Sequence, residues 1–577
     1  MRVSSTFLGT RGVVACFLGL LSTIASIGPA LGQPAPASSG SATPVSASAS
    51  PASVPSALPL QALLDAREKS IDRSGIIVGA VDGGTTTIYT AGTSGTGRPI
   101  DEHTLFEIGS VTKTFTATIL ASMVRDGSVS LDDPVAKYLP AGVTVPERHG
   151  KKITLLNLAT QHSGLPRLPT NLDITHTTDP YATYTVAQMY AFLSHYKLTR
   201  DPGAQFEYSN YGVALLGQAL ANRAHTSYAD LLRKRVLDPL GMHDTSLALS
   251  AEQRTRFAAG GTVDGDAAPP WTITLAIAPA GGIHSSMADM LKYLRCNMGQ
   301  GPLAKTCLFA QQPRDTFPGN HIGLIWWTGD TRHIVHHGGD TAGYHASIAI
   351  APDRTRGAVV LANGGLPVED VAIHTLDATV PLASLPPSIP VDSATLDTYV
   401  GDYRSKDGSD TFTITRNGDH LMARLSKQDA IRLYASEPDT FYPRVVAATI
   451  QFVRTGGVVS ALILKQDGQT GIFTKPGMQA PAESSMYPPV VKLDAATLRE
   501  YIGNYSSSYG IFYVTLADGQ LMVRLAGQPA LPTFPSARDH FYYKVVDAQI
   551  EFQRDAKGNV TGLTLHQNGA IIPATRQ

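Results

Sequence analysis

The sequence predicts an α+β body followed by two small antiparallel β modules. In residues 60–385, segments with apolar residues at helical spacing alternate with short apolar runs that are typical of buried strands. After the proline-rich residues 385–387, apolar and polar residues alternate between turn residues, as in antiparallel strands. This second region also repeats itself at an offset of 100 to 102 residues, which indicates two copies of one module.

Length and composition set the broad class of the protein. The 577 residues exceed the roughly 250–300 at which one hydrophobic core stops growing, so several domains are expected. The 46 basic and 47 acidic side chains nearly cancel and form no long run of either sign, so neither a nucleic-acid partner nor an anionic membrane surface is indicated. With 43% hydrophobic and 16% charged residues, the composition is that of an ordinary globular protein.

Residues 1–32 are predicted to be a signal peptide. Arg2 and Arg11 precede an apolar run over residues 13–27, and the small residues that follow suit a cleavage site. Export is therefore expected, with the mature protein periplasmic or secreted. The alternative is an uncleaved membrane anchor, because the apolar run is not far short of the ~20 residues that a membrane span needs.

Residues 33–59 are predicted to be a disordered linker. They are almost wholly Ala, Pro, Ser, Gly and Val. Such a segment has too few large apolar side chains to form a core of its own, so it is expected to act as a spacer before the body.

The body is expected to hold the chemistry, in residues 60–385. A helix is predicted where Val111, Phe115, Ile119 and Met123 recur at helical spacing, and further helices are predicted over residues 211–224 and 288–298. Short apolar runs predict buried strands over residues 76–81, 346–351 and 357–363. These elements surround the three motifs described below.

Two of the three cysteines are expected to pair. Cys16 lies in the predicted signal peptide, whereas Cys296 and Cys307 are eleven residues apart with glycine and proline between them. Such a pair can close a short loop by a disulfide in an oxidising compartment. The alternative is two buried thiols.

The tail is expected to form one module over residues 392–475 and a second over 492–577. The matching segments include Tyr399-Val400-Gly401-Asp402-Tyr403 with Tyr501-Ile502-Gly503-Asn504-Tyr505, and Leu421-Met422-Ala423-Arg424-Leu425 with Leu521-Met522-Val523-Arg524-Leu525. Asn417-Gly418 and Asp518-Gly519 separate alternating runs and favour hairpin turns, because both residue types tolerate positive φ.

The first motif is Ser110-Val111-Thr112-Lys113, which follows Phe106-Glu107-Ile108-Gly109 at the start of a predicted helix. A spacing of three places both side chains on one helical face, so the amine of Lys113 can reach the hydroxyl of Ser110. The helix start adds partial positive charge and free N–H groups, which suit a developing anion. Ser110 is therefore a candidate nucleophile. The alternative is a capping serine beside a solvated lysine.

The second motif is Tyr208-Ser209-Asn210, between the turn at Pro202-Gly203 and a predicted helix. A phenol near a lysine can share or transfer protons, and the amide of Asn210 can hold a substrate carbonyl or the lysine. The alternative is ordinary helix capping by Ser209 or Asn210.

The third motif runs from His337 through Gly338, Gly339 and Asp340 to Tyr344, beside an apolar strand. Its glycines allow a substrate backbone to approach a strand edge, which can present an N–H to a reacting carbonyl oxygen. Several histidines cluster here, yet none has a recognisable metal-ligand spacing. We therefore expect neither a metal site nor a cofactor. The histidines are His333, His336, His337 and His345.

Taken in this order, the three motifs resemble those of the penicillin-recognising serine hydrolases, most closely the class C β-lactamase and D-alanyl-D-alanine carboxypeptidase/esterase branch. The resemblance covers residues 60–385 and extends to the flanking segments 155–166, 239–242 and 281–283. It implies a β-lactamase/transpeptidase-like domain, with an antiparallel sheet flanked by helices. The tail repeats resemble the small lipocalin-like modules that often accompany such hydrolases.

The resemblance also assigns roles to individual residues. It makes Ser110 the nucleophile, Lys113 and Tyr208 the general base and acid pair, and Asn210 a substrate-orienting amide. The backbone N–H groups of Ser110 and Asp340 would form the oxyanion hole, which stabilises the negatively charged intermediate.

The third motif departs from that of the antibiotic-hydrolysing members, which commonly begins with Lys-Thr. Here His337-Gly338-Gly339 offers a mostly neutral imidazole and no hydroxyl, so a substrate carboxylate should be held more weakly. We expect hydrolysis of D-amino-acid peptides or simple acyl esters, with slow turnover of β-lactams. The expected partner is a small molecule or a peptide derived from peptidoglycan. The alternative is a non-catalytic sensor or docking protein that binds penicillin or muropeptides.

Overall fold

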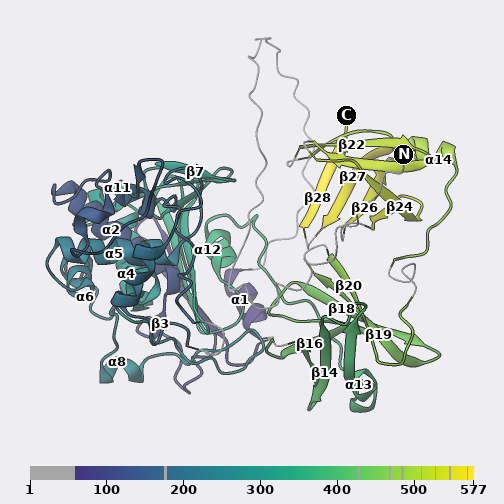
Figure 1. Cartoon of the computed structure of the whole chain (residues 1–577), viewed down its shortest axis with the longest axis horizontal. Coiled ribbons are helices and arrows are strands. Elements are labelled where there is room, and N and C mark those ends of the chain that lie inside the picture. Colours follow the sequence, from purple (N-terminus) through teal and green to yellow (C-terminus); the bar gives the residue numbers. More distant parts are fainter. Residues whose placement is uncertain are drawn as a thin grey trace, which may run out of the picture. The chain divides into compact units, whose positions relative to one another are not determined.

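The computed structural model describes residues 59–69, 71–173, 179–426, 428–466, 469–481, 487–507, 510–526, 528–544, 548–567 and 570–577. The predicted signal peptide and all but the last residue of the predicted linker lie outside these residues. The described chain divides into two compact units at Ser384 and Leu385, which we call the body and the tail (Figure 1).

An antiparallel sheet of eight strands forms the centre of the body, in the order β2-β1-β12-β11-β10-β9-β8-β7. Its strands are β1 (Gly75–Asp82), β2 (Thr85–Gly92), β7 (Asp315–Phe317), β8 (Asn320–Ile322), β9 (Trp327–Gly329), β10 (Val335–Asp340), β11 (His345–Ile350) and β12 (Arg356–Ala362). The chain thus begins the sheet with a hairpin and completes it much later, so residues far apart in the sequence become neighbours. One such pair is Ile76 and Ala362.

Both faces of the sheet are buried at the strand β1. Ile76 and Val78 of β1 pack with residues of α1 (Leu60–Glu68) and α12 (Glu369–Leu376), whereas Ile77 belongs to the larger core on the opposite face. Because alternate side chains of a strand point to opposite faces, both sets must be apolar. This explains the continuous apolar run over residues 76–81.

Helices fill the rest of the body. The larger core brings together α2, α5 and α10 with the sheet. The remaining bounds are α2 (Thr112–Arg125), α3 (Leu155–Ala159), α4 (Val186–His195), α5 (Asn210–Arg223), α6 (Tyr228–Leu232), α7 (Asp238–Leu240), α8 (Ala251–Thr255), α9 (Ala278–Gly281), α10 (Met287–Asn297) and α11 (Ala304–Gln311). Shorter elements are the 3₁₀ turns η1 (Gly109–Val111) and η2 (Val135–Tyr138) and the π turn η3 (Arg233–Leu237). Two small strand pairs complete the body. In one, β3 (Leu105–Glu107) pairs with β6 (His284–Ser286), and in the other, β4 (Glu147–Arg148) pairs with β5 (Lys151–Lys152).

The tail consists of two closed antiparallel barrels of eight strands each. The first contains α13 (Ser393–Tyr399), β13 (Gly401–Ser405), β14 (Thr411–Asn417), β15 (His420–Leu425), β16 (Ile431–Glu437), β17 (Thr440–Tyr442), β18 (Ala448–Thr455), β19 (Val458–Gln466) and β20 (Gln469–Thr474). The second contains α14 (Ala495–Glu500), β21 (Gly503–Ser507), β22 (Gly510–Ala517), β23 (Gln520–Leu525), β24 (Leu531–Ala537), β25 (His540–Tyr543), β26 (Ala548–Arg554), β27 (Val560–Gln567) and β28 (Ala570–Arg576). The predicted fold class, an α+β body followed by two antiparallel β modules, is confirmed.

The repeated sequence segments form the same contacts in both barrels. In the first, Tyr403 Oη donates to the backbone oxygen of Tyr399 over 2.5 Å, and the guanidinium of Arg454 lies 5.2 Å from the centre of the Tyr399 ring. In the second, Tyr505 Oη donates to the backbone oxygen of Tyr501 over 2.7 Å. A buried tyrosine hydroxyl needs such a partner, which explains why the paired tyrosines recur.

In each barrel, a short segment before the first helix forms hydrogen bonds with the strands. We call these segments, residues 386–389 and 488–491, the straps. In the first barrel, Tyr442 Oη donates to the carbonyl of Pro386 over 2.6 Å, and the amide of Ile389 donates to β16. In the second, Tyr542 Oη donates to the carbonyl of Pro488 over 2.9 Å, and the amide of Val491 donates to β24. The straps thus lie before residues 392 and 492, where the modules were expected to begin.

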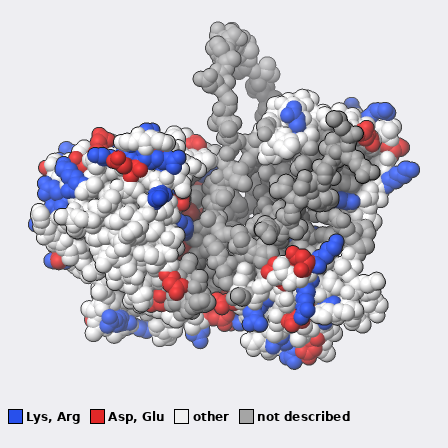
Figure 2. Space-filling model, viewed as in Figure 1, with Lys and Arg blue, Asp and Glu red and all other residues white. Residues whose placement is uncertain are grey.

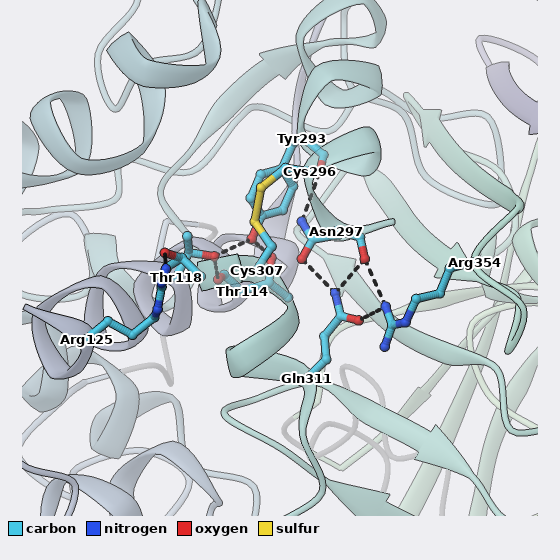
Figure 3. Close-up of a disulfide and its surroundings, with 10 residues drawn as sticks. Thr114, Thr118, Arg125, Tyr293, Cys296, Asn297, Cys307, Gln311 and Arg354 are labelled. Carbon is cyan, nitrogen blue, oxygen red and sulfur yellow. Dashed lines mark hydrogen bonds between the residues drawn. A yellow bond between two sulfur atoms is a disulfide. The ribbon is translucent and has the colours of Figure 1, made fainter. Parts of the chain in front are cut away.

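A disulfide joins Cys296 at the end of α10 to Cys307 in α11, with 6.1 Å between the two Cα atoms (Figure 3). Both cysteines are fully buried. Beside them, Gln311 Nε2 donates to the side-chain and backbone oxygens of Asn297 over 2.9 and 3.0 Å. The two helices are therefore connected both covalently and by hydrogen bonds.

Charged side chains of both signs are interspersed over the face shown in Figure 2. This distribution agrees with the nearly balanced composition. Within the residues that the structure describes, no helix has the length and apolar character needed to cross a membrane.

Candidate active site

Ser110 lies in the 3₁₀ turn that leads into α2, rather than in the α-helix itself. The preceding Gly109 has a φ of 46°, and a Cβ at this position would lie only 2.7 Å from the amide nitrogen of Asp340. Glycine is therefore needed, because any side chain would clash with the backbone of β10. The turn places Ser110 beside the strand that carries the third motif.

Lys113 is directed at Ser110 from the first turn of α2. Its Nζ donates to Ser110 Oγ over 2.7 Å and to the backbone oxygen of Ala280 over 2.7 Å. The side chain is 0% exposed. Burial holds the pKa of Lys113 well below its ordinary value, with a further lowering by the charge of Arg167 and an opposing effect of Asp340. The amine can therefore become neutral and accept a proton, which an exposed lysine at neutral pH cannot do.

Tyr208 completes the group around Ser110. The centre of its ring is 4.9 Å from Lys113 Nζ, and its side chain forms a hydrogen bond with that of Ser110. Burial raises the pKa of Tyr208, an effect that the hydrogen bond to Ser110 and the charge of Arg167 only partly offset. The lysine thus favours losing its proton and the tyrosine favours keeping it. This difference was not visible in the sequence, which left the two residues as an unassigned acid and base pair.

Asn210 is the first residue of α5, and Ser209 caps this helix. Ser209 Oγ accepts a hydrogen bond from the amide of Gly212 over 2.8 Å, and it donates to the carbonyl of Pro166 over 2.7 Å. The Asn210 side chain instead forms a hydrogen bond with the hydroxyl of Tyr181, and its Oδ1 has no partner among the described residues. Capping therefore explains Ser209 but leaves Asn210 available to a substrate.

The first four residues of the third motif, 337–340, form the end of β10, and its two glycines face opposite ways. A Cβ on Gly339 would lie 2.3 Å from the backbone oxygen of Ile108 and 2.7 Å from the amide nitrogen of Ser110, whereas a Cβ on Gly338 would meet nothing closer than Glu369 at 3.5 Å. Gly339 thus allows β10 to lie directly against the turn of Ser110. This contact places the backbone of Asp340 next to the turn that holds Ser110.

His337 is 1% exposed, and its Nδ1 contacts the backbone oxygen of Gly338 at 2.6 Å. Burial lowers its pKa to about 3, with the nearby charge of Lys113 adding to the effect. The imidazole is therefore neutral at pH 7. Its neighbours His336 and His345 pair with Glu369 and Asp340 over 2.7 and 2.6 Å. No group of three or more metal-ligating side chains occurs among the described residues.

A pocket of about 300 Å³ opens beside Ser110. Its lining is mostly apolar and aromatic, with Ser110 and Asn210 among its polar groups. The lining residues are Gly109, Ser110, Tyr181, Asn210, Trp271, Ile273, Ile277, Ala280, Gly281, Asp340 and Thr341.

The sequence motifs did not reveal several residues of this site. Tyr181, Trp271 and Thr341 line the pocket, and Arg167 lies with its guanidinium 5.1 Å from the centre of the Tyr208 ring. Glu107 is buried, accepts a hydrogen bond from the backbone amide of Trp271 and lies in the segment that precedes Ser110. Arg167 directly follows the segment 155–166, and Thr341 lies in the third motif without an assigned role, whereas Tyr181 and Trp271 lie in no recognised segment. Nothing in their spacing indicates the pocket, because only the fold brings these segments together.

The arrangement is that of a candidate nucleophilic-serine site, in which the hydroxyl of Ser110 contacts the buried amine of Lys113 and lies near the phenol of Tyr208 and the strand β10. A family model described as Beta-lactamase matches residues 60–380, and the chain belongs to this family. In the tail, a model described as a domain of unknown function, DUF3471, matches residues 385–476 and 487–573. Its two matches begin at the two straps.

Individual relatives carry related names. The chain is 37% identical over 188 residues to the D-alanyl-D-alanine-carboxypeptidase/endopeptidase AmpH of Escherichia coli (strain K12), covering 33% of this chain and 47% of that protein. It thus spans about half the length of that relative. It is 28% identical over 339 residues to a Beta-lactamase of Pseudomonas fluorescens, covering 51% of this chain and 90% of that protein. The crystal structure of a Beta-lactamase/D-alanine Carboxypeptidase from Yersinia pestis complexed with citrate superposes with a TM-score of 0.48 and 25% identity, covering 56% of this chain and 95% of that one.

Proposed function

We propose that the protein is an exported serine hydrolase that forms an acyl-enzyme on Ser110. The observation that supports this most directly is the 2.7 Å contact between Ser110 Oγ and the Nζ of the fully buried Lys113. A lysine with a lowered pKa next to a serine hydroxyl can act as its general base. A lysine with only a structural role would not need to contact the hydroxyl of Ser110.

In the proposed reaction, neutral Lys113 accepts the proton of Ser110 Oγ as the oxygen attacks the carbonyl carbon of the substrate. The amides of Ser110 and Asp340 donate to the oxyanion, and each such donor contributes about 3–4 kcal/mol to the transition state. Tyr208 gives its proton to the leaving group, and the proton held by Lys113 restores it. Water then attacks the acyl-enzyme, losing a proton to the same pair while Ser110 Oγ regains one.

We infer that the substrates are D-amino-acid peptides or simple acyl esters, and that β-lactams are hydrolysed slowly. A neutral His337 stands where the antibiotic-hydrolysing members carry a cationic lysine, so a substrate carboxylate gains no ion pair from this position. The apolar lining of the pocket suits an uncharged acyl group. The similarity to the carboxypeptidase/endopeptidase AmpH points in the same direction.

Export is part of the proposal. The predicted signal peptide and the bond between Cys296 and Cys307 support it, because disulfides persist in oxidising compartments.

A hydrolysis panel tests the function. Nitrocefin, short p-nitrophenyl esters and a D-Ala-D-Ala peptide are offered to the wild-type protein and to Ser110→Ala, with intact mass spectrometry after each incubation. We expect the wild type to turn over ester or peptide, and Ser110→Ala to lose at least about 10³-fold in kcat/KM because the nucleophile is gone.

Three other outcomes would contradict the proposal. Efficient benzylpenicillin turnover without esterase or peptidase activity would reverse the substrate assignment. A stable adduct on Ser110 without turnover would identify a non-catalytic sensor instead. Unchanged activity in Ser110→Ala would show that Ser110 is not the nucleophile.

A further inference from the structure

Glu107 is a buried carboxyl that joins two walls of the pocket. It is the last residue of β3, three positions before Ser110, and it is 3% exposed. Its Oε1 accepts a hydrogen bond of 3.1 Å from the backbone amide of Trp271, a residue of the pocket lining. The proposed mechanism gives this carboxyl no role.

The second carboxyl oxygen faces the opposite wall. Oε2 of Glu107 and Oγ1 of Thr341 are both buried, and neither has a hydrogen-bond partner of normal geometry among the described residues. The Thr341 side chain nevertheless lies near enough to lower the pKa of the carboxyl. Thr341 also lines the pocket, directly after the oxyanion residue Asp340, and its amide is fixed by a 2.9 Å hydrogen bond to Tyr344.

The titratable groups beside Glu107 do not favour its ionised form. His284 of β6 lies close to Glu107, with Nε2 3.9 Å from Oε1, but burial lowers the pKa of His284 to about 4 and leaves it neutral. Asp179 opposes ionisation by its own negative charge, and the buried Tyr344 phenol beside Glu107 has a raised pKa and stays uncharged. Burial, reinforced by Asp179, raises the pKa of Glu107 to about 7, against the lowering effects of Thr341 and Trp271.

We propose that Glu107 is a positioning residue whose protonation state sets the direction of the Thr341 hydroxyl in the pocket. When Glu107 is neutral, its Oε2–H donates to Thr341 Oγ1, and the hydroxyl proton of Thr341 can donate to a bound substrate. When Glu107 is ionised, its carboxylate can only accept hydrogen bonds. The Thr341 hydroxyl then donates to Glu107, and the substrate is left without this donor. The inference rests on the proposed function.

This geometry predicts in which direction kcat/KM changes with pH. The active form is protonated Glu107, so kcat/KM should fall as the pH rises through about 7. The other groups of the site act elsewhere: Lys113 must lose its proton and produces a rising limb, and the pKa of Tyr208 lies above its ordinary value of 10. A falling limb near neutral pH therefore reports Glu107.

The experiment is a kcat/KM profile between pH 5 and 9 with a p-nitrophenyl ester, read at a wavelength where product absorbance is independent of pH. We expect the wild type to lose about tenfold across the falling limb, the effect of one hydrogen bond to substrate. Glu107→Gln should remove the limb, because its amide N–H donates to Thr341 at every pH. Thr341→Val should start about tenfold lower at pH 6 and also lack the limb, while Thr341→Ser should restore it.

Glu68→Gln is the matched control. Glu68 is also a buried carboxyl with a raised pKa, at 5% exposure, but it bonds to Ser74 and does not line the pocket. This variant should keep the falling limb. A limb that persists in Glu107→Gln or Thr341→Val, or a wild-type profile without one, would overturn the inference while leaving the hydrolase function intact. Absence of any Ser110-dependent hydrolysis would instead overturn the proposed function, and the inference with it.

Thermal unfolding of Glu107→Gln checks both folding and titration. The folded-state pKa of about 7 exceeds the ordinary carboxyl value of 4.5, so the contribution of Glu107 to stability is full below pH 4.5 and is lost as the pH rises through 7. The stability of Glu107→Gln relative to the wild type should therefore increase as the pH rises from 5 to 8. A constant difference over that range would show that Glu107 does not titrate there and would contradict the inference.

Discussion

At the scale of single residues, two adjacent glycines of β10 have opposite surroundings. Gly339 faces the turn of Ser110 with no room for a Cβ, whereas Gly338 faces Glu369 across ordinary contact distance. The sequence presents both simply as members of a glycine-rich motif. Only the pairing of β10 with the turn before α2 makes one of them indispensable.

This difference gives a matched pair of variants. Gly339→Ala should push β10 away from Ser110 and lower kcat by about 10²-fold, because a displacement near 1 Å at the reacting groups is enough for such a loss. Gly338→Ala should stay within about twofold of the wild type, since the added methyl group meets only van der Waals contacts. Steady-state kinetics of both variants checks this, and equal losses in the two would contradict the proposed oxyanion hole.

The residue scale also shows how environment changes the meaning of a motif. The sequence indicated a mostly neutral His337 from its ordinary pKa, and burial makes the neutral form still more favourable. For Lys113 the sequence gave the correct neighbour in space, one helical turn from Ser110. It could not give the direction in which the pKa of Lys113 is shifted, which depends on the complete burial of this side chain.

At the scale of elements, local periodicity predicted the main helices well. The predicted helices over residues 211–224 and 288–298 match α5 (Asn210–Arg223) and α10 (Met287–Asn297). The helix expected from Ser110 onward begins instead with the 3₁₀ turn η1, and α2 starts at Thr112. Helix ends depend on the neighbouring elements, here β10, so they are less accessible from sequence than helix interiors.

The link between α10 and α11 yields a prediction on stability. Replacing both Cys296 and Cys307 by alanine should lower the free energy of unfolding of the body by about 2–4 kcal/mol, the usual contribution of a disulfide that restricts the unfolded chain. All three tryptophans, Trp271, Trp326 and Trp327, lie in the body, so their fluorescence during denaturation reports this unit alone. The reduced wild type is the control, and it should unfold at the same denaturant concentration as the double variant. Equal stability of the oxidised wild type and the double variant would show that the bond does not stabilise the body.

At the scale of the whole molecule, the units have separate hydrophobic cores. The body contains one large core and a smaller one beneath α1 and α12, and each barrel has a core of its own residues. The closed barrels leave no unpaired strand edge at their seams, because β13 pairs with β20 and β21 pairs with β28. Each unit therefore has the internal contacts that independent folding requires.

A chain that ends at Ser384 should consequently retain the site. We expect its kcat/KM within about twofold of the full protein and an unchanged unfolding midpoint by tryptophan fluorescence, because all residues of the pocket and its cores remain. Binding to isolated cell-wall material is measured for both forms. A loss of activity on truncation would assign the barrels a part in the site, and a loss of wall binding alone would assign them a docking role.

The sequence by itself determined the features that depend on short stretches of chain. These are the α+β body, the two repeated modules, the spacing of Ser110 and Lys113, and the three motifs that define the family. Periodicity and motif spacing are local properties, so they can be read without coordinates.

The tertiary structure alone decided which groups are buried together and what protonation states they hold. It brings Glu107 to Thr341, places Gly339 against Ser110, and directs the carbonyls of Pro386 and Pro488 to tyrosines of their barrels. Such contacts join residues that are remote in the chain. Desolvation, which sets the pKa of Lys113, His337 and Glu107, exists only once the chain has folded around them.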